Sequence, residues 1–144
     1  MPPRLTAVTL GVRDLPASVR FYEALGCVRK VRATGDEVAF FAAGGAVLAL
    51  YPWELLAKDA KLAAEPRPAA FRGTTLAWNC ASADEVDAAF ARALAAGATP
   101  LKSPQKTEWG GYSGYFADPD GHAWEVVHAP AFALSPDGCL LLPD

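Results

Sequence analysis

The sequence predicts an α+β protein in which one βαβββ unit occurs twice. Alternating stretches rich in β-branched residues at 5–12 and 74–82 are typical of strands. Each is followed by a helical segment that ends at a glycine, and then by three short apolar stretches. Because this order recurs after about 68 to 76 residues, the chain contains an internal duplication.

The first unit is expected over residues 4–51. Its strands and helix are a strand over 5–12, a helix within 13–26, and strands over 27–33, 36–44 and 46–52. Asp14 or Ser18 would cap the start of the helix, and Gly26 would end it. Short turns rich in glycine connect the last three strands.

Residues 52–72 separate the two units and contain a short helical stretch followed by a proline-broken linker. The second unit is expected over residues 73–128. Its elements are a strand over 74–82, a helix over 83–97, and strands over 98–103, 112–118 and 122–128. The tail, residues 129–144, matches neither unit, so we expect it to pack along the outside or against a partner.

The composition excludes several classes of protein. With 144 residues, 52% hydrophobic and 20% charged, the chain is expected to fold as a single domain. The 13 Lys and Arg residues are scattered and the net charge is -3, which argues against a nucleic-acid partner. There is no apolar run of membrane length and no signal peptide, so a cytoplasmic protein without a membrane partner is expected.

Two motifs identify a resemblance. The first, D-L-x-x-S-x-x-F-Y, is matched by Asp14, Leu15, Ser18, Phe21 and Tyr22. The second, F-x-D-P-D-G-x-x-x-E, is matched by Phe116, Asp118, Pro119, Asp120, Gly121 and Glu125. Over roughly residues 4–128 the chain therefore resembles the vicinal oxygen chelate superfamily, which includes glyoxalase I, bleomycin-resistance proteins and extradiol dioxygenases. This resemblance implies a glyoxalase-like cupped mixed sheet around a concave pocket.

The resemblance also implies where a metal would bind. Members of the superfamily hold a divalent ion with four side chains, on the first and fourth strands of each module. In this sequence those positions are occupied by Ala7, Ala49, Thr75 and Glu125. Alanine has no donor atom and a neutral hydroxyl is a poor ligand, so we expect no metal and no other cofactor. His122 and His128 each lie three positions from Glu125, so strand alternation places them on the other face.

Alternation also selects the residues that would line the pocket. Tyr51, Trp53, Trp109 and Tyr112 are expected to form an aromatic rim, because they lie at strand ends and in a strand-entry loop. Tyr115 lies ten residues before Glu125, where some extradiol dioxygenase relatives carry an active-site tyrosine. The candidate ligand-binding residues are Thr9, Tyr51, Trp53, Thr75, Asn79, Trp109, Tyr112, Tyr115 and Glu125. Trp78 and Trp124 point the other way and are expected in the core.

Glu125 has three alternative roles. It is either a fold-inherited residue hydrogen-bonded to Thr75, Asn79 or a water, or the counter-ion of a cationic ligand, or a general base. The favoured function is metal-independent binding of a small aromatic or cationic molecule, by a homodimer as in the bleomycin-resistance branch. The alternative is a glyoxalase-like lyase, isomerase or dioxygenase, either dependent on metal or using Glu125 as its base. Whether the protein is an enzyme stays open, and no other catalytic residue is assigned.

Overall fold

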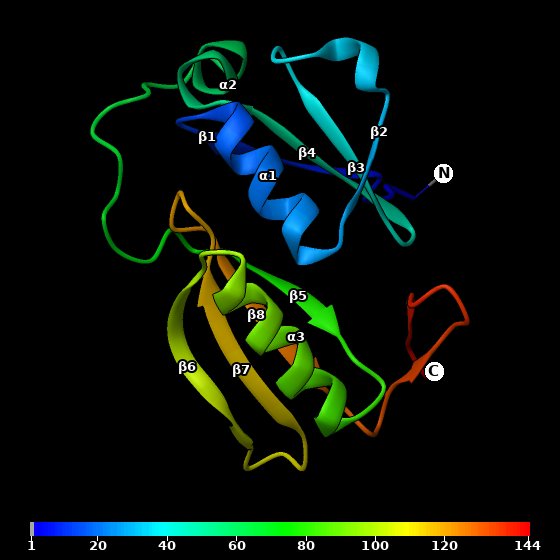
Figure 1. The fold of residues 1–144 in the computed structure, drawn as a ribbon. Coiled ribbons are helices and arrows are strands. Elements are labelled where there is room, and N and C mark those ends of the chain that lie inside the picture. The colour runs from blue at the N-terminus through cyan, green and yellow to red at the C-terminus, as the bar shows by residue number, and fades with distance from the viewer. Residues whose placement is uncertain (1) are drawn as a thin grey trace. The chain divides into compact units, whose positions relative to one another are not determined.

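The computed structural model describes residues 2–144. The chain divides into two compact units, and the boundary in the sequence falls between Arg72 and Gly73. Each unit contains one four-stranded mixed sheet, with two α-helices in the first unit and one in the second (Figure 1). The predicted α+β class with two βαβββ modules is thereby confirmed.

The first unit contains five strand or helix segments of the βαβββ module and one extra helix. They are β1 Ala7–Val12, α1 Leu15–Leu25, β2 Val28–Lys30, β3 Ala39–Ala43, β4 Ala46–Pro52 and α2 Trp53–Asp59. The strand order is β1-β4-β3-β2, and β1 runs parallel to β4. The strand expected over 27–33 is shorter, because a 3-10 turn, Arg32–Thr34, follows it.

Helix α1 begins and ends where its sequence signals lie. Of the two candidate caps it is Asp14 that acts, since its Oδ1 accepts a hydrogen bond from the Ala17 N–H at 3.0 Å. Gly26 ends the helix in the left-handed conformation, with φ of 106°. The fully buried Tyr22 brings the helix onto β3, where its ring lies 6.0 Å from that of Phe41.

The second unit repeats the module and adds a C-terminal hairpin. Its elements are β5 Thr75–Asn79, α3 Ala83–Ala95, β6 Thr99–Lys106, β7 Tyr112–Ala117, β8 Ala123–His128, β9 Ala133–Leu134 and β10 Leu140–Leu141. The strand order is β5-β8-β7-β6, with β5 parallel to β8. The edge strand β6 extends beyond the expected 98–103, and two irregularities interrupt its pairing with β7. The antiparallel β9–β10 hairpin was not predicted.

The core of the second unit lies between α3 and one face of its sheet. Ser82 Oγ caps the helix by accepting from the Glu85 N–H at 3.1 Å. From the sheet, Phe116 and Val126 are fully buried. The Phe116 ring stacks on the half-buried Trp124 with centroids 6.2 Å apart and planes 4° from parallel, so Trp124 lies on the helix-covered face.

Candidate functional site

Each sheet has one face that its module helix covers and one that it does not. In the second unit, Phe116 and Val126 belong to the face that α3 covers, so alternation assigns the remaining side chains to the other face. We call this the helix-free face of the second unit. It carries Thr75, Ala77, Asn79, Ser113, Tyr115, Ala117, Ala123, Glu125 and Val127.

The chemical centre of this face is a pair formed by Tyr115 and Glu125. The two residues lie directly opposite each other in the antiparallel β7–β8 ladder, and their side chains are hydrogen-bonded. Desolvation, the negative charge of Glu125 and this hydrogen bond all raise the pKa of the Tyr115 phenol. The phenol therefore stays protonated at neutral pH and donates a hydrogen bond to the carboxylate of Glu125. Tyr115, which the sequence does not suggest as a partner of Glu125, thus lies opposite it and interacts with it.

The charge of Glu125 is not neutralised within the part of the chain that the structure describes, residues 2–144. Ion pairs in this part of the chain include those of Glu23, Glu54 and Glu65, and none is formed by Glu125. Lys102 lies beyond Tyr115 on the edge strand β6 and is exposed, but it makes no ion pair with Glu125. The carboxylate is half-buried beside the small side chain of Ala77.

One predicted rim residue of the second unit, Tyr112, turns away from Glu125. The Tyr112 hydroxyl donates a hydrogen bond to Asp87 Oδ1 of α3 at 2.7 Å, so its side chain lies on the helix-covered face. This follows from spacing, because Tyr112 and Tyr115 are three positions apart in one strand. The structure therefore does not bring Tyr112 together with Glu125. Trp109 is 60% exposed in the loop before β7, and its ring lies against Gly111.

The first unit has an equivalent row of residues paired across three neighbouring strands, but it contains no counterpart of the carboxylate of Glu125. Thr9 pairs with Ala49, and Ala49 with Phe40, just as Ala77 pairs with Glu125 and Glu125 with Tyr115. Phe40 is therefore the counterpart of Tyr115. Sequence reasoning missed it, although a two-glycine turn between β3 and β4 determines this register. Tyr51 is half-buried on the same face, opposite Gly11.

Trp53 closes one end of the helix-free face of the first unit. A Cβ added to Gly11 would lie 3.0 Å from the Trp53 ring, so the indole rests directly on β1. Its Nε1 donates a hydrogen bond to the Ala64 carbonyl at 2.9 Å, and the Arg67 and Arg72 guanidinium groups lie 5.0 and 5.1 Å from its ring centroid. This predicted rim residue is thus covered by its own linker.

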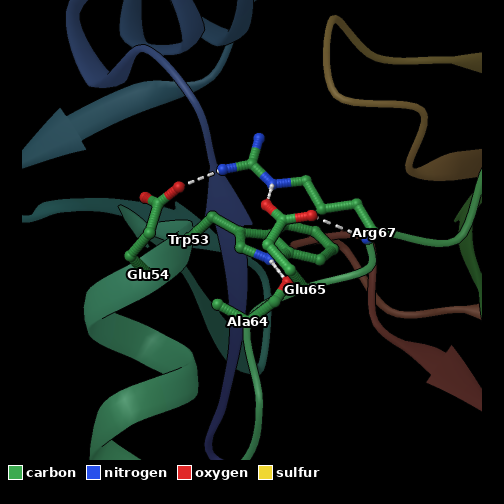
Figure 2. Close-up of polar contacts among 5 residues, drawn as sticks. All are labelled: Trp53, Glu54, Ala64, Glu65 and Arg67. Atoms are coloured by element: carbon green, nitrogen blue, oxygen red, sulfur yellow. Dashed lines mark hydrogen bonds and ion pairs between the residues drawn. The ribbon is translucent and has the colours of Figure 1, made fainter.

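Figure 2 shows how the linker is held. The Arg67 guanidinium lies over the indole between two carboxylates, those of Glu54 and Glu65. Its Nε is 3.3 Å from Glu65 Oε1, and the Trp53 Nε1 bond to Ala64 anchors the segment from below. Because the ion pairs are largely exposed, we expect the indole contacts to contribute most of the anchoring.

Replacing Trp53 with phenylalanine should loosen this linker. The substitution removes the Nε1 donor and shrinks the surface under both arginines, so residues 64–72 should open more often. Trypsin cleavage after Arg72 should become severalfold faster, as measured by mass spectrometry over a digestion time course. Trp109→Phe is the matched control and should leave this rate unchanged. An unchanged rate in Trp53→Phe would show that the indole does not hold the linker.

The residues at the implied metal positions do not fit a metal. Ala7, Ala49 and Thr75 supply no charged donor, and the carboxylate of Glu125 is engaged by Tyr115. Across residues 2–144 no group of three or more His, Cys, Asp or Glu side chains is arranged to hold a metal ion. His128 lies in the row of Tyr112, on the helix-covered face, with Nδ1 3.2 Å from the Cys80 carbonyl oxygen.

Two of the three cysteines, Cys27 and Cys80, do not provide a reactive nucleophile at neutral pH. Burial raises the pKa of the Cys27 thiol to about 11, and burial together with the charge of Glu85 raises the pKa of Cys80 to about 11. A raised thiol pKa leaves the neutral form dominant below pH 11. Cys80 beside His128 is therefore not a thiolate–imidazolium pair.

Thiol labelling should follow these pKa values. At pH 8 the thiolate fraction of Cys27 and Cys80 should be roughly a hundredfold below that of a thiol with the ordinary pKa of 9.0. Labelling with a disulfide reagent, followed by peptide mass mapping, should be slow at both residues and accelerate about tenfold per pH unit between pH 8 and 10. Rapid labelling of either residue in the folded protein at pH 8 would contradict this account.

Among the described residues, no helix combines the length and the apolar character needed to cross a membrane. Comparison with family models gives a match over residues 4–126 to the Glyoxalase/Bleomycin resistance protein/Dioxygenase superfamily. Comparison with curated proteins gives no match.

Solved structures resemble the chain closely. A glyoxalase-related enzyme from Fulvimarina pelagi is 34% identical, with a TM-score of 0.88 over 99% of this chain and 100% of that one. A glyoxalase/bleomycin resistance protein/dioxygenase from Nocardioides is 30% identical, with a TM-score of 0.72 over 89% and 84% of the two chains. A lactoylglutathione lyase from Agrobacterium tumefaciens, 24% identical with a TM-score of 0.67 over 90% and 96%, shares the fold.

Proposed function

The chain belongs to the glyoxalase/bleomycin resistance protein/dioxygenase superfamily, and on this basis we propose that it binds a small organic molecule without a metal. The helix-free faces of the two modules supply the binding surfaces in this proposal. They offer small and aromatic side chains around few directional polar groups, the composition typical of small-molecule sites.

One observation carries the proposal. Of the four positions at which the superfamily binds its metal, only Glu125 has a charged donor, and Tyr115 hydrogen-bonds to it. A catalytic metal site needs about three protein ligands, which this arrangement does not supply. The same carboxylate is well suited to an organic ligand, since it is held in one orientation on a partly apolar surface.

A thermal-shift experiment tests the proposal. Melting temperatures are measured with nickel, zinc, manganese or iron, and in parallel with a set of small aromatic and cationic compounds, for the unmodified protein and for Glu125→Ala. A ligand stabilises the state that binds it. The proposal therefore predicts that organic compounds raise the melting temperature, and that no metal raises it in a way that depends on Glu125. A metal-induced shift of several degrees that Glu125→Ala abolishes would contradict it.

An enzyme is the second candidate function. The relative from Fulvimarina pelagi is described as a glyoxalase-related enzyme, and the Tyr115–Glu125 pair contains a carboxylate able to accept a proton. In this alternative Glu125 is the general base. The chain should then show lactoylglutathione lyase or another glyoxalase-type activity that Glu125→Gln removes while the melting temperature is kept. Activity that survives this substitution would exclude Glu125 as the base.

The homodimer stays a prediction. Leu140, Leu141 and Leu142 near the C-terminus are 40%, 49% and 72% exposed, which would suit a contact with a second copy. Light scattering in solution would decide between a monomer and a dimer.

A further inference from the structure

The Tyr115–Glu125 pair can accept further hydrogen bonds but has none left to donate. The phenol has one hydrogen to donate, and it is already used on the carboxylate of Glu125. The remaining hydrogen-bonding groups on the helix-free face are the lone pairs of the phenol oxygen and of the carboxylate. These lone pairs can only accept hydrogen bonds. A ligand that presents carbonyl, carboxylate or phosphate oxygens to this pair would therefore meet acceptors and repulsion.

The pair also carries a charge without a counter-charge. Glu125 is half-buried, and within residues 2–144 no basic side chain forms an ion pair with it. A partly desolvated carboxylate without an ion-pair partner is strongly stabilised when a cation that donates hydrogen bonds binds to it. The ring of Tyr115, on the same face, adds an aromatic surface suited to a cationic group.

The duplication supplies an internal comparison. In the equivalent row of the first unit, Phe40 replaces the phenol and Ala49 replaces the carboxylate, so hydroxyl and acid are both missing there. A lysine pairs with the aromatic residue in each row: Lys30 with Phe40 in the first unit and Lys102 with Tyr115 in the second. Because the first sheet forms the same ladder with an apolar pair, the acid–phenol pair is not required by the fold.

We propose that the Tyr115–Glu125 pair selects ligands whose cationic group bears N–H donors, such as an ammonium or amidinium attached to an apolar or aromatic body. Glu125 binds the cation directly. Tyr115 acts as a positioning residue that orients the carboxylate and adds a second acceptor. This inference rests on the proposed metal-independent binding and names the chemical class of its ligand.

Three small probes of similar shape test the chemistry. Benzamidine carries an N–H-bearing cation, phenyltrimethylammonium has the charge without N–H, and benzoate has the opposite charge and only acceptors. Binding is followed by NMR titration of the full chain up to about 10 mM, the range expected of such fragments. Benzamidine should bind, phenyltrimethylammonium should bind severalfold more weakly, and benzoate should not bind at this face. Equal binding of all three, or no binding of benzamidine, would overturn the proposal.

Matched variants locate the effect. Glu125→Gln keeps the shape and an oxygen acceptor but removes the charge, so benzamidine affinity should fall roughly tenfold or more. Tyr115→Phe should reduce it severalfold, whereas Tyr112→Phe, on the same strand but the helix-covered face, should leave it unchanged. Melting curves of each variant confirm that it is folded. Benzamidine binding that Glu125→Gln does not weaken would overturn the proposal.

The two proposals fail in different ways. If the metal-free protein binds a neutral or anionic compound independently of Glu125, the ligand class is wrong and metal-independent binding stands. If Glu125 instead holds a metal, the function proposed for the site is itself wrong.

Discussion

Replacing Phe116 with alanine is expected to lower the free energy of unfolding by about 3 to 5 kcal/mol. The side chain is fully buried under α3, and its ring stacks on Trp124 at 6.2 Å. Truncation removes this contact and leaves a cavity that the sheet cannot close. Because small domains are stable by only about 5 to 15 kcal/mol, this is a large share of the total. Urea denaturation followed by circular dichroism measures it.

Phe71→Ala is the matched control. This phenylalanine is 74% exposed in the linker, so its removal should change the unfolding free energy by no more than about 0.5 kcal/mol. If both substitutions cost the same, Phe116 does not lie in the core of the folded protein in solution.

Replacing Asp118 with alanine should have the second largest effect on stability, a loss of about 2 to 4 kcal/mol. The buried Oδ1 of Asp118 accepts hydrogen bonds from the N–H groups of Asp120 and His122, both at 2.9 Å. These bonds hold the turn between β7 and β8. Without the acceptor, the N–H groups of the buried Asp120 and the half-buried His122 lose their partner, which costs more than the bonds themselves contribute. Urea denaturation again measures the loss.

Asp118→Asn is the conservative control because it retains a side-chain oxygen in the same place. It should cost about 1 kcal/mol, clearly less than alanine. The turn sets the pairing of Tyr115 with Glu125, so Asp118→Ala should also weaken benzamidine binding even where the protein remains folded. Equal stability of the alanine and asparagine variants would show that the carboxylate oxygen does not support the turn.

The order of the elements could be predicted because each depends on local signals. Asp14 and Gly26 bound α1, and the alternating stretches at 5–12 and 74–82 contain the first strands of the two modules. The equivalence of Ala49 and Glu125 also agrees with the strand register, since each pairs with a corresponding residue of the parallel strand.

The partner of Glu125 could not be predicted with the same certainty. The sequence suggests Thr75, Asn79 or a water as the partner of Glu125. Identifying Tyr115 requires the register of β7 against β8, which the composition of the turn between them does not reveal. The covering of Trp53 by Arg67 and Arg72 was likewise hidden, because these contacts depend on the path of a proline-rich linker. The sequence suggests that Tyr112 lies in the loop before β7 and so at the rim, whereas it is the first residue of β7 and strand alternation turns it toward α3.

The most direct test of the account is the metal content of the purified protein. The protein and Glu125→Ala are each purified without chelators, exposed to nickel, zinc, manganese and iron, desalted, and analysed by elemental mass spectrometry. Because one carboxylate bound to a phenol does not make a metal site, both should retain only traces of metal, in equal amounts. Stoichiometric metal in the unmodified protein that is lost in Glu125→Ala would contradict the account.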